Sequence, residues 1–204
     1  MRIAKEKAAE NRGKVVAAAA GLLRARGLDG VGVDALAEAA GLTHGAVYSH
    51  FKSKSELAAE AVRQAMHLSM DEWLALTKGL SADAAFAQLL KTYVSRAHRD
   101  HPEVGCTVAA IGSGAPRAAD DLREVFSTGT AQFIDILSSV TEAETDADRR
   151  RMAIARAAAM VGAVVMARAA ASDKVLSDEI LKSVRTELLS HPAAVANHRS
   201  DETR

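Results

Sequence analysis

The feature that most constrains this chain is a pair of short helical segments, within residues 36–51, that meet at a glycine. Leu36, Ala37 and Ala40 recur at helical spacing, which predicts one buried face on the first segment. Gly41 follows the last of these residues, at a place where helices commonly end in the left-handed conformation. The chain is therefore expected to turn sharply here between two helices.

The second segment begins at Thr43, whose hydroxyl can cap a helix, and Val47 and Phe51 lie four residues apart on its inner side. Two helices joined by a short turn with glycine form a helix-turn-helix, whose second helix enters the major groove of DNA. Polar side chains and a bare glycine suit contact with phosphates and base edges. The outward residues are His44, Gly45, Tyr48 and Ser49. A buried helical corner without a ligand gives the same pattern and stays open at this point.

Composition favours an all-α protein of the cytoplasm. The 204 residues allow one or two domains, their formal net charge is zero, and the single cysteine rules out an internal disulfide framework. Residues 1–56 hold nine Lys/Arg against six Asp/Glu, the basic end expected of a nucleic-acid module. No signal peptide is expected, and the longest uncharged apolar run, 157–167, is shorter than the roughly 20 residues of a membrane span.

Around the turn, helical periodicity places a charged arm at residues 1–12, a helix at 12–26 and a glycine-rich connector at 28–33. Another helix starts at Asp34. Ser53 and Glu56 have the spacing of a capping box, which predicts a helix over 54–78. Its apolar stripe consists of Leu57, Ala61, Ala65 and Leu68. Its amino end has a partial positive charge and carries Lys54, so it suits a phosphate group.

Residues 14–68 resemble the amino-terminal domain of the TetR/AcrR family of bacterial transcriptional regulators. The resemblance rests on residues 18–27, 33–51 and 52–57, and above all on one ordered set: Gly41, Gly45, Tyr48, Phe51, Lys54 and Leu57. It implies that the recognition helix reaches DNA through Thr43, His44, Gly45, Tyr48 and His50, with Lys54 clamping a phosphate. Val47 and Phe51 would hold a three-helix core.

The chain departs from the family pattern just before the second helix. Many members carry a Thr-Thr pair there, whose hydroxyls cap the helix and touch phosphate, whereas residues 31–33 here read Val-Gly-Val. The second helix is therefore expected to lack a side-chain cap. Asp34 can still interact favourably with the helix dipole.

The remaining chain predicts helices at 81–98, 104–112, 117–140 and 148–171, with a loop at 112–116. A last helix starts at Ser177, taken as its cap. With those above, this gives about nine helices. The predicted domains are a DNA-binding domain at 10–57 (motif about 32–51), joined by helix 54–78 to an effector-binding and dimerisation domain at 79–190. A flexible tail follows at 191–204.

The helix at 148–171 is apolar over most of its circumference and has to be covered on several sides. A symmetric dimer would cover it together with the last helix, as the resemblance also implies, whereas an ordinary intrachain bundle is the alternative. The expected interface residues are Ala158, Gly162, Ile180, Val184 and Leu188. Paired recognition helices would read a palindromic double-stranded DNA operator.

The resemblance also implies a pocket for a small-molecule effector that releases a repressor from DNA. Arg168, in an apolar helix, could face an anionic group, and plain core packing is the alternative for the others. The candidate lining residues are Trp73, Tyr93, Phe126, Phe133, Met160, Met166 and Arg168.

Two rival classes remain. One is a DNA-binding protein that has no effector or responds to another protein. The other is a metal sensor or enzyme that uses His98, His101 and Cys106, although that spacing is not a familiar zinc pattern. No phosphate loop, nucleophile elbow or carboxylate pair stands out, so we expect neither catalysis nor a cofactor or resident metal.

Overall fold

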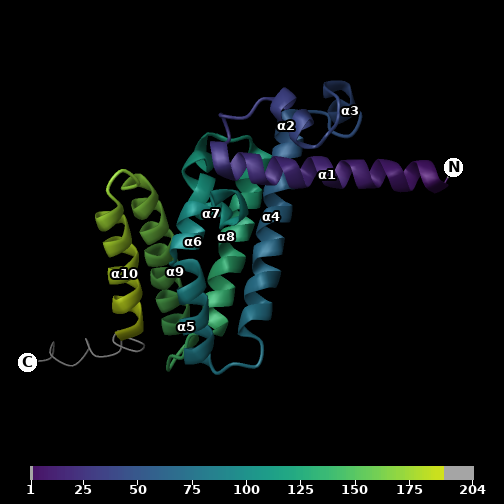
Figure 1. The fold of residues 1–204 in the computed structure, drawn as a ribbon. Helices are drawn as coiled ribbons and strands as arrows, with labels where there is room; N and C mark the ends of the chain where they lie inside the picture. The colour runs from purple at the N-terminus through teal and green to yellow at the C-terminus, as the bar shows by residue number, and fades with distance from the viewer. Residues whose placement is uncertain (1, 191–204) are drawn as a thin grey trace, which may run out of the picture. The chain divides into compact units, whose positions relative to one another are not determined.

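The computed structural model describes the backbone of residues 2–190 and the side chains of residues 6–190. Within this part the chain is all-α, as predicted, and contains no strand (Figure 1). The helices in chain order are α1 (Arg2–Arg26), α2 (Val33–Ala39), α3 (His44–Tyr48), α4 (Lys54–Thr77), α5 (Ala82–Tyr93), α6 (Arg96–Asp100), the 3-10 helix η1 (Pro102–Val104), α7 (Thr107–Ile111), the 3-10 helix η2 (Gly112–Arg117), α8 (Asp120–Ser139), α9 (Asp146–Ala169) and α10 (Lys174–Ser190).

The chain forms two compact units, each built from two stretches of sequence. The head unit comprises Met1–Ser69 and His101–Thr130, and the body unit comprises Met70–Asp100 and Ala131–Arg204. Helices α4 and α8 each contribute residues to both units. The predicted domains followed one another in sequence, whereas here residues 101–130 group with the head.

Helix α1 is longer than predicted. The expected charged arm at 1–12 is wrong, because the helix begins at Arg2. On its exposed side Glu10 pairs with Lys7 at 3.2 Å and with Lys14 at 2.6 Å, at the spacings that stabilise helices. The helix ends as predicted at Gly27, whose φ of 84° is left-handed.

The predicted helix at 81–98 is divided in two. Val94 leaves the helical region with ψ of 71°, which separates α5 from α6. The hydroxyl of Ser95 then accepts a hydrogen bond from the His98 amide at 3.1 Å and so supports the first turn of α6. Apolar periodicity continues across the break, which is why the sequence suggested one helix.

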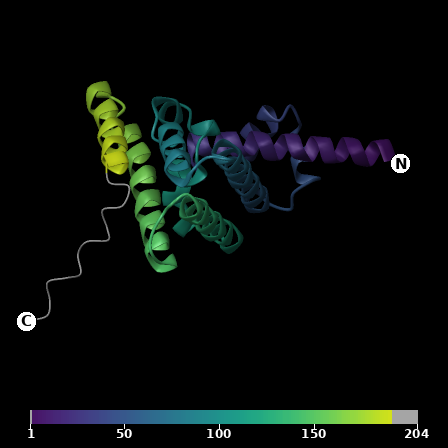
Figure 2. The same cartoon turned by 90° about the horizontal axis from the view of Figure 1, so that it is seen from below.

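The start of α10 also corrects a prediction. Asp173 caps this helix, since its carboxylate accepts from the amides of Val175 and Leu176 at 3.1 and 3.0 Å. Ser177, predicted to be the cap, is fully buried inside α10 and donates to the carbonyl of Ala167 on α9 at 2.7 Å. Helices α9 and α10 lie side by side in both views (Figures 1 and 2).

Smaller differences concern surfaces and ends. Leu68, expected on the buried stripe of α4, is exposed. The stretch 112–116, expected as a loop, lies in η2, and α7 covers only part of the predicted helix at 104–112. The predicted flexible tail at 191–204 lies outside the described residues.

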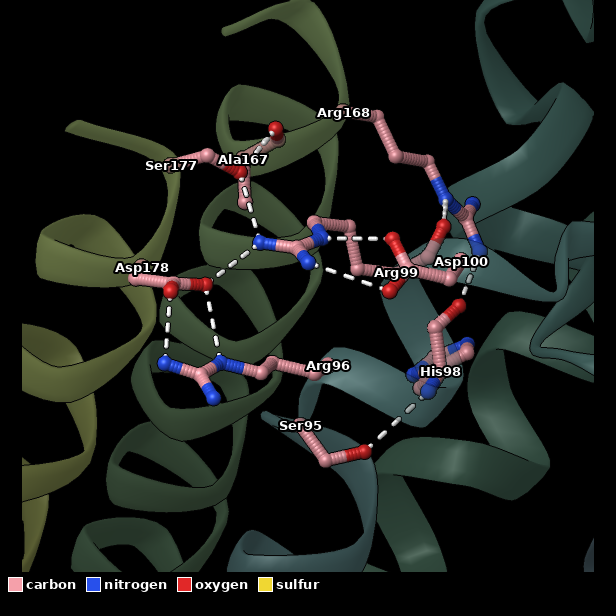
Figure 3. A network of polar contacts seen from close by, with 9 residues as sticks. All are labelled: Ser95, Arg96, His98, Arg99, Asp100, Ala167, Arg168, Ser177 and Asp178. Carbon is pink, nitrogen blue, oxygen red and sulfur yellow. Dashed lines mark hydrogen bonds and ion pairs between the residues drawn. The ribbon is translucent and has the colours of Figure 1, made fainter. Parts of the chain in front are cut away.

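A polar network ties α6 to α9 and α10 within the body unit (Figure 3). Arg99, almost fully buried, donates to the carboxylates of Asp100 and Asp178 and to the hydroxyl of Ser177. Arg96 donates to the same Asp178 at 3.0 and 2.6 Å. Hydrogen bonds from Arg96, and then from Arg99, lower the pKa of Asp178. Arg168 donates to the carbonyls of His98 and Arg99 at 2.6 and 3.0 Å, so it closes the carboxyl end of α6.

Candidate nucleic-acid interface

Helices α2 and α3 form the predicted turn. Gly41 has a left-handed φ of 65°, and the amide of Leu42 donates to the carbonyl of Ala37 at 2.9 Å across it. The hydroxyl of Thr43 accepts from the amide of Ala46 at 3.3 Å, which confirms the predicted cap of α3. The turn is held by backbone geometry and one side chain, and its angle is therefore fixed locally.

One side of this pair is buried and the other is open. Leu36, Ala37, Val47 and Phe51 are buried, as the periodicity predicted. The exposed residues are Thr43, His44, Gly45, Tyr48 and Ser49, while His50 is half-buried. Polar side chains on the exposed side of a short helix can meet a duplex without moving the core behind it.

The imidazole of His44 has two neighbours. Its Nδ1 contacts the carboxylate of Asp34 in the first turn of α2. Its ring lies against that of Tyr48, with centroids 5.2 Å apart. Helix α2 begins at Val33, and Gly32 before it provides no side-chain cap, as predicted. The sequence did not point to the contact between Asp34 and His44, because ten residues and a turn separate the two.

The amino end of α4 is capped from both directions. The Glu56 amide donates to the hydroxyl of Ser53 at 3.1 Å, which confirms half of the predicted capping box. The carboxylate of Glu56 accepts from the amide of Lys52 at 2.7 Å, one residue earlier than a capping box requires. Lys54 is the first residue of α4 and is half-buried.

A further brace joins α1, α4 and the end of the turn. The Arg12 guanidinium forms a two-pronged ion pair with the carboxylate of Glu60. The same guanidinium lies 4.6 Å from the centre of the Phe51 ring. The hydrogen bond to Glu60 raises the pKa of Arg12. This arrangement holds Phe51, which follows the end of α3, in place. No sequence signal suggested it.

Comparisons with known proteins agree with this geometry. Residues 15–61 match the model of the family described as bacterial regulatory proteins, tetR family. The matched segment, which runs from within α1 to within α4, is a domain of this family. A search of curated proteins by sequence finds no match.

Several solved structures share the fold over most of the chain. A regulator from Cytophaga hutchinsonii is 21% identical, with a TM-score of 0.75 over 90% of this chain and 95% of that one. One from Chloroflexus aurantiacus is 24% identical, with a TM-score of 0.74 over 91% and 96%. Reduced Escherichia coli NemR is 16% identical, with a TM-score of 0.72 over 87% and 96%. The shared fold and the family match of residues 15–61 together indicate a DNA-binding transcriptional regulator.

The candidate effector residues do not all come together. Trp73, Tyr93 and Phe133 form an aromatic cluster in the body unit, with ring centroids 4.7–5.8 Å apart. Met160 is fully buried in the same unit, whereas Phe126 is buried in the head unit.

The other two candidates on α9 point elsewhere. Met166 is exposed, and the guanidinium of Arg168 is engaged with α6 carbonyls.

His98 borders the aromatic cluster. Its Nδ1 lies 2.7 Å from the Tyr93 carbonyl, so it carries the proton and donates, and its ring meets the Tyr93 ring edge-on at 4.5 Å. Burial lowers the pKa of His98 to about 4. The imidazole is therefore neutral at physiological pH and belongs to the packing of the body unit.

The alternative metal site gains no support. Among the described residues no group of three or more His, Cys, Asp or Glu side chains is placed to hold a metal ion. His98 is engaged with a carbonyl, His101 pairs with Glu103 at 3.1 Å, and Cys106 is buried at the start of α7.

Helices α9 and α10 carry the predicted interface residues. Ala158 is exposed, while Gly162, Ile180, Val184 and Leu188 are half-buried. Within the described part of the chain, α9 is long and apolar enough by composition to cross a membrane, because an 18-residue window of it has a mean hydropathy of 1.5. Within that window, 44% is buried in the protein.

Proposed function

We propose that this TetR-family regulator is a cytoplasmic homodimeric repressor that a small-molecule effector releases from a palindromic operator. The observation that carries the DNA-contacting part is the exposed row Thr43, His44, Gly45 and Tyr48 on a capped helix with its apolar side buried. In this proposal α3 enters the major groove, and Gly45 allows the backbone to approach closely.

Phosphate contacts would flank this row. Lys54 stands at the amino end of the 24-residue helix α4, where the helix dipole adds to its charge. Tyr48 and His50 can donate to phosphate oxygens from α3 and the residues after it. These contacts would set the register of the protein on DNA, and base contacts from Thr43 and His44 would provide specificity.

The salt dependence of binding tests whether these residues contact phosphates and not bases. Lys54→Ala should weaken binding to all duplexes about equally and reduce the slope of log K against log salt by roughly one phosphate contact. Tyr48→Phe should weaken binding in the same sequence-independent way. Lys78→Ala, which removes an exposed lysine beyond the other end of α4, is the matched control. Unchanged affinity in both Lys54→Ala and Tyr48→Phe would contradict the proposed placement of α3.

Dimerisation is proposed from the surface of α9 and α10. Ile154, Val165 and Met166 on α9, with Leu176 on α10, are large apolar side chains exposed in the single chain. A second copy would cover them, and two heads roughly 34–36 Å apart would read half-sites one DNA turn apart. Met166→Glu should therefore shift sedimentation from dimer to monomer and weaken operator binding. A wild-type protein that sediments as a monomer at every concentration would overturn this part.

The effector would bind in the predicted domain at 79–190, next to the aromatic cluster. Trp73, the single tryptophan, is one of its members and should report entry by fluorescence. A compound that releases DNA should also change Trp73 emission. If a broad metabolite library neither shifts thermal unfolding nor releases DNA, the alternative of an effector-free or protein-regulated DNA-binding protein gains the support instead.

A further inference from the structure

The contact between Asp34 and His44 is unusual in its setting. Both side chains are largely exposed, and the two residues come from different helices of the turn. The Asp34 carboxylate nevertheless contacts His44 Nδ1, while the Tyr48 ring lies next to the imidazole at a tilt of 43°. Two separate neighbours thus fix the position and the rotation of this ring.

The chemical consequence concerns which ring nitrogen remains for a ligand. A nitrogen that faces a carboxylate carries the proton, because a carboxylate can only accept a hydrogen bond. Nδ1 of His44 is therefore a donor to Asp34, and Nε2 is the remaining polar atom. Nε2 is separated from Nδ1 by Cε1, and its hydrogen-bonding direction points away from that of Nδ1. The pair thereby selects the atom that His44 can offer to a base edge.

If Asp34 acted only through its negative charge, it would weaken DNA binding instead of supporting recognition. A carboxylate beside the DNA-contacting row repels phosphates, so its removal would strengthen binding to every duplex. An orienting hydrogen bond acts on base recognition and leaves the general phosphate attraction to other residues. The two roles predict changes of opposite sign, which makes them separable by experiment.

We propose that Asp34 is a positioning residue for sequence recognition: it holds His44 Nδ1 and so presents Nε2 to the hydrogen-bonding edge of one base in the operator. This inference rests on the proposed entry of α3 into the major groove. Asp34 contacts no base itself and acts through His44. Helix α2 has no side-chain cap, and through Asp34 it contributes to specificity.

The test starts from a duplex selected out of a random pool by the wild-type protein and compares it with a scrambled duplex. The variants are Asp34→Ala, Asp34→Asn, His44→Ala and the double variant Asp34→Ala/His44→Ala. Asp34→Ala should lower the ratio of selected to scrambled affinity about 5- to 10-fold, the scale of one base contact. Asp34→Asn keeps an oxygen acceptor and should retain most of the ratio. In the His44→Ala background, Asp34→Ala should change the ratio less than twofold.

Two controls exclude a general effect. Glu38→Ala removes another exposed carboxylate from α2 and should leave the ratio unchanged. Nitrogen-15 NMR of the histidine rings, assigned by comparison with His44→Ala, reads the tautomer without DNA. It should show a protonated Nδ1 on His44 in the wild type and a mixture of tautomers in Asp34→Ala.

Three outcomes overturn the proposal. The first is equal strengthening of both duplexes by Asp34→Ala and Asp34→Asn, which assigns Asp34 to simple repulsion. The second is that Asp34→Ala lowers the ratio of selected to scrambled affinity equally in the wild-type and His44→Ala backgrounds. The third is a neutral His44 protonated at Nε2 in the wild type, even with DNA binding intact. Failure of the wild type to select any duplex would instead overturn the proposed DNA placement, and NMR would still report the pair.

Discussion

The buried guanidinium of Arg99 offers a quantitative test of how the body unit is held together. Its side chain is 6% exposed and binds Asp100 at 2.8 and 3.0 Å, Asp178 at 2.7 Å and the Ser177 hydroxyl at 2.9 Å. Replacement by methionine keeps the apolar stem, so that little cavity forms, but it removes every one of these bonds. Breaking a buried pair costs about 3–5 kcal/mol when the remaining charge stays buried.

In Arg99→Met the carboxylates left without Arg99 are partly solvated. The side chains of Asp100 and Asp178 are 45% and 33% exposed, so water can replace part of what is lost. Asp178 also keeps its two bonds to Arg96, and Ser177 still donates to Ala167. We therefore expect Arg99→Met to lower the free energy of unfolding by about 2–3 kcal/mol, below the full buried-pair value.

Arg96 is the matched control, because it binds the same carboxylate from the surface. Its side chain is 71% exposed, and an exposed ion pair is worth about 0–1 kcal/mol. Arg96→Met should thus cost less than 1 kcal/mol.

Urea unfolding followed by circular dichroism, at one protein concentration and pH 7, gives both values. The concentration is fixed because a dimer's apparent stability depends on it. An Arg96→Met loss equal to or larger than that of Arg99→Met would refute the reasoning that burial decides the strength of these bonds.

Three further predictions concern single residues. Burial lowers the pKa of His98 to about 4, whereas the unfolded chain binds this proton near pH 6.5. The urea midpoint should therefore fall as the pH drops from 6.5 to 4. His98→Asn should make the urea midpoint depend less on pH in this range. A methyl group at Gly30 would lie 2.1 Å from the carbonyl oxygen of Arg26, so Gly30→Ala should lower the melting temperature, whereas Gly13→Ala, with open space, should raise it slightly. Arg12→Met, which removes the brace on α4 and Phe51, should destabilise the head by about 1–2 kcal/mol in urea unfolding.

The helix-turn-helix could be predicted from the sequence because its determinants are local. Gly41 supplies the left-handed turn, Thr43 caps α3, and the i, i+4 pair Val47 and Phe51 marks the buried side. Each of these signals lies within a few residues of the structure that it produces. The same holds for Gly27 at the end of α1 and for Ser53 at the start of α4.

One wrong prediction arose because the partner of the residue lies on another helix. Ser177 has the composition of a cap, but a carbonyl on α9 takes its hydroxyl, and Asp173 caps the helix instead. Another concerns the amino end of α1, which was expected as a charged arm. Ion pairs of Glu10 with Lys7 and Lys14, at helical spacing, stabilise it as a helix.

At the candidate site, the row of exposed residues followed from periodicity, but its side-chain partners did not. The contacts of His44 with Asp34 and of Arg12 with Glu60 depend on how separate helices meet. Likewise, the predicted pocket mixed residues from both units with an exposed methionine, because an apolar stripe does not say which neighbour covers it.

The discontinuous head has a consequence for anyone who wishes to transplant this protein's DNA specificity. A crossover after residue 57 would separate residues of α1 and α4 from partners downstream in sequence, among them the Gly105 carbonyl bound by Arg24 and the Asp121 carboxylate bound by Ser55. Leu28 would also lose the close packing of Gly114. A chimaera that contains residues 101–130 together with the first 69 residues retains these contacts. Both segments therefore have to be exchanged at once.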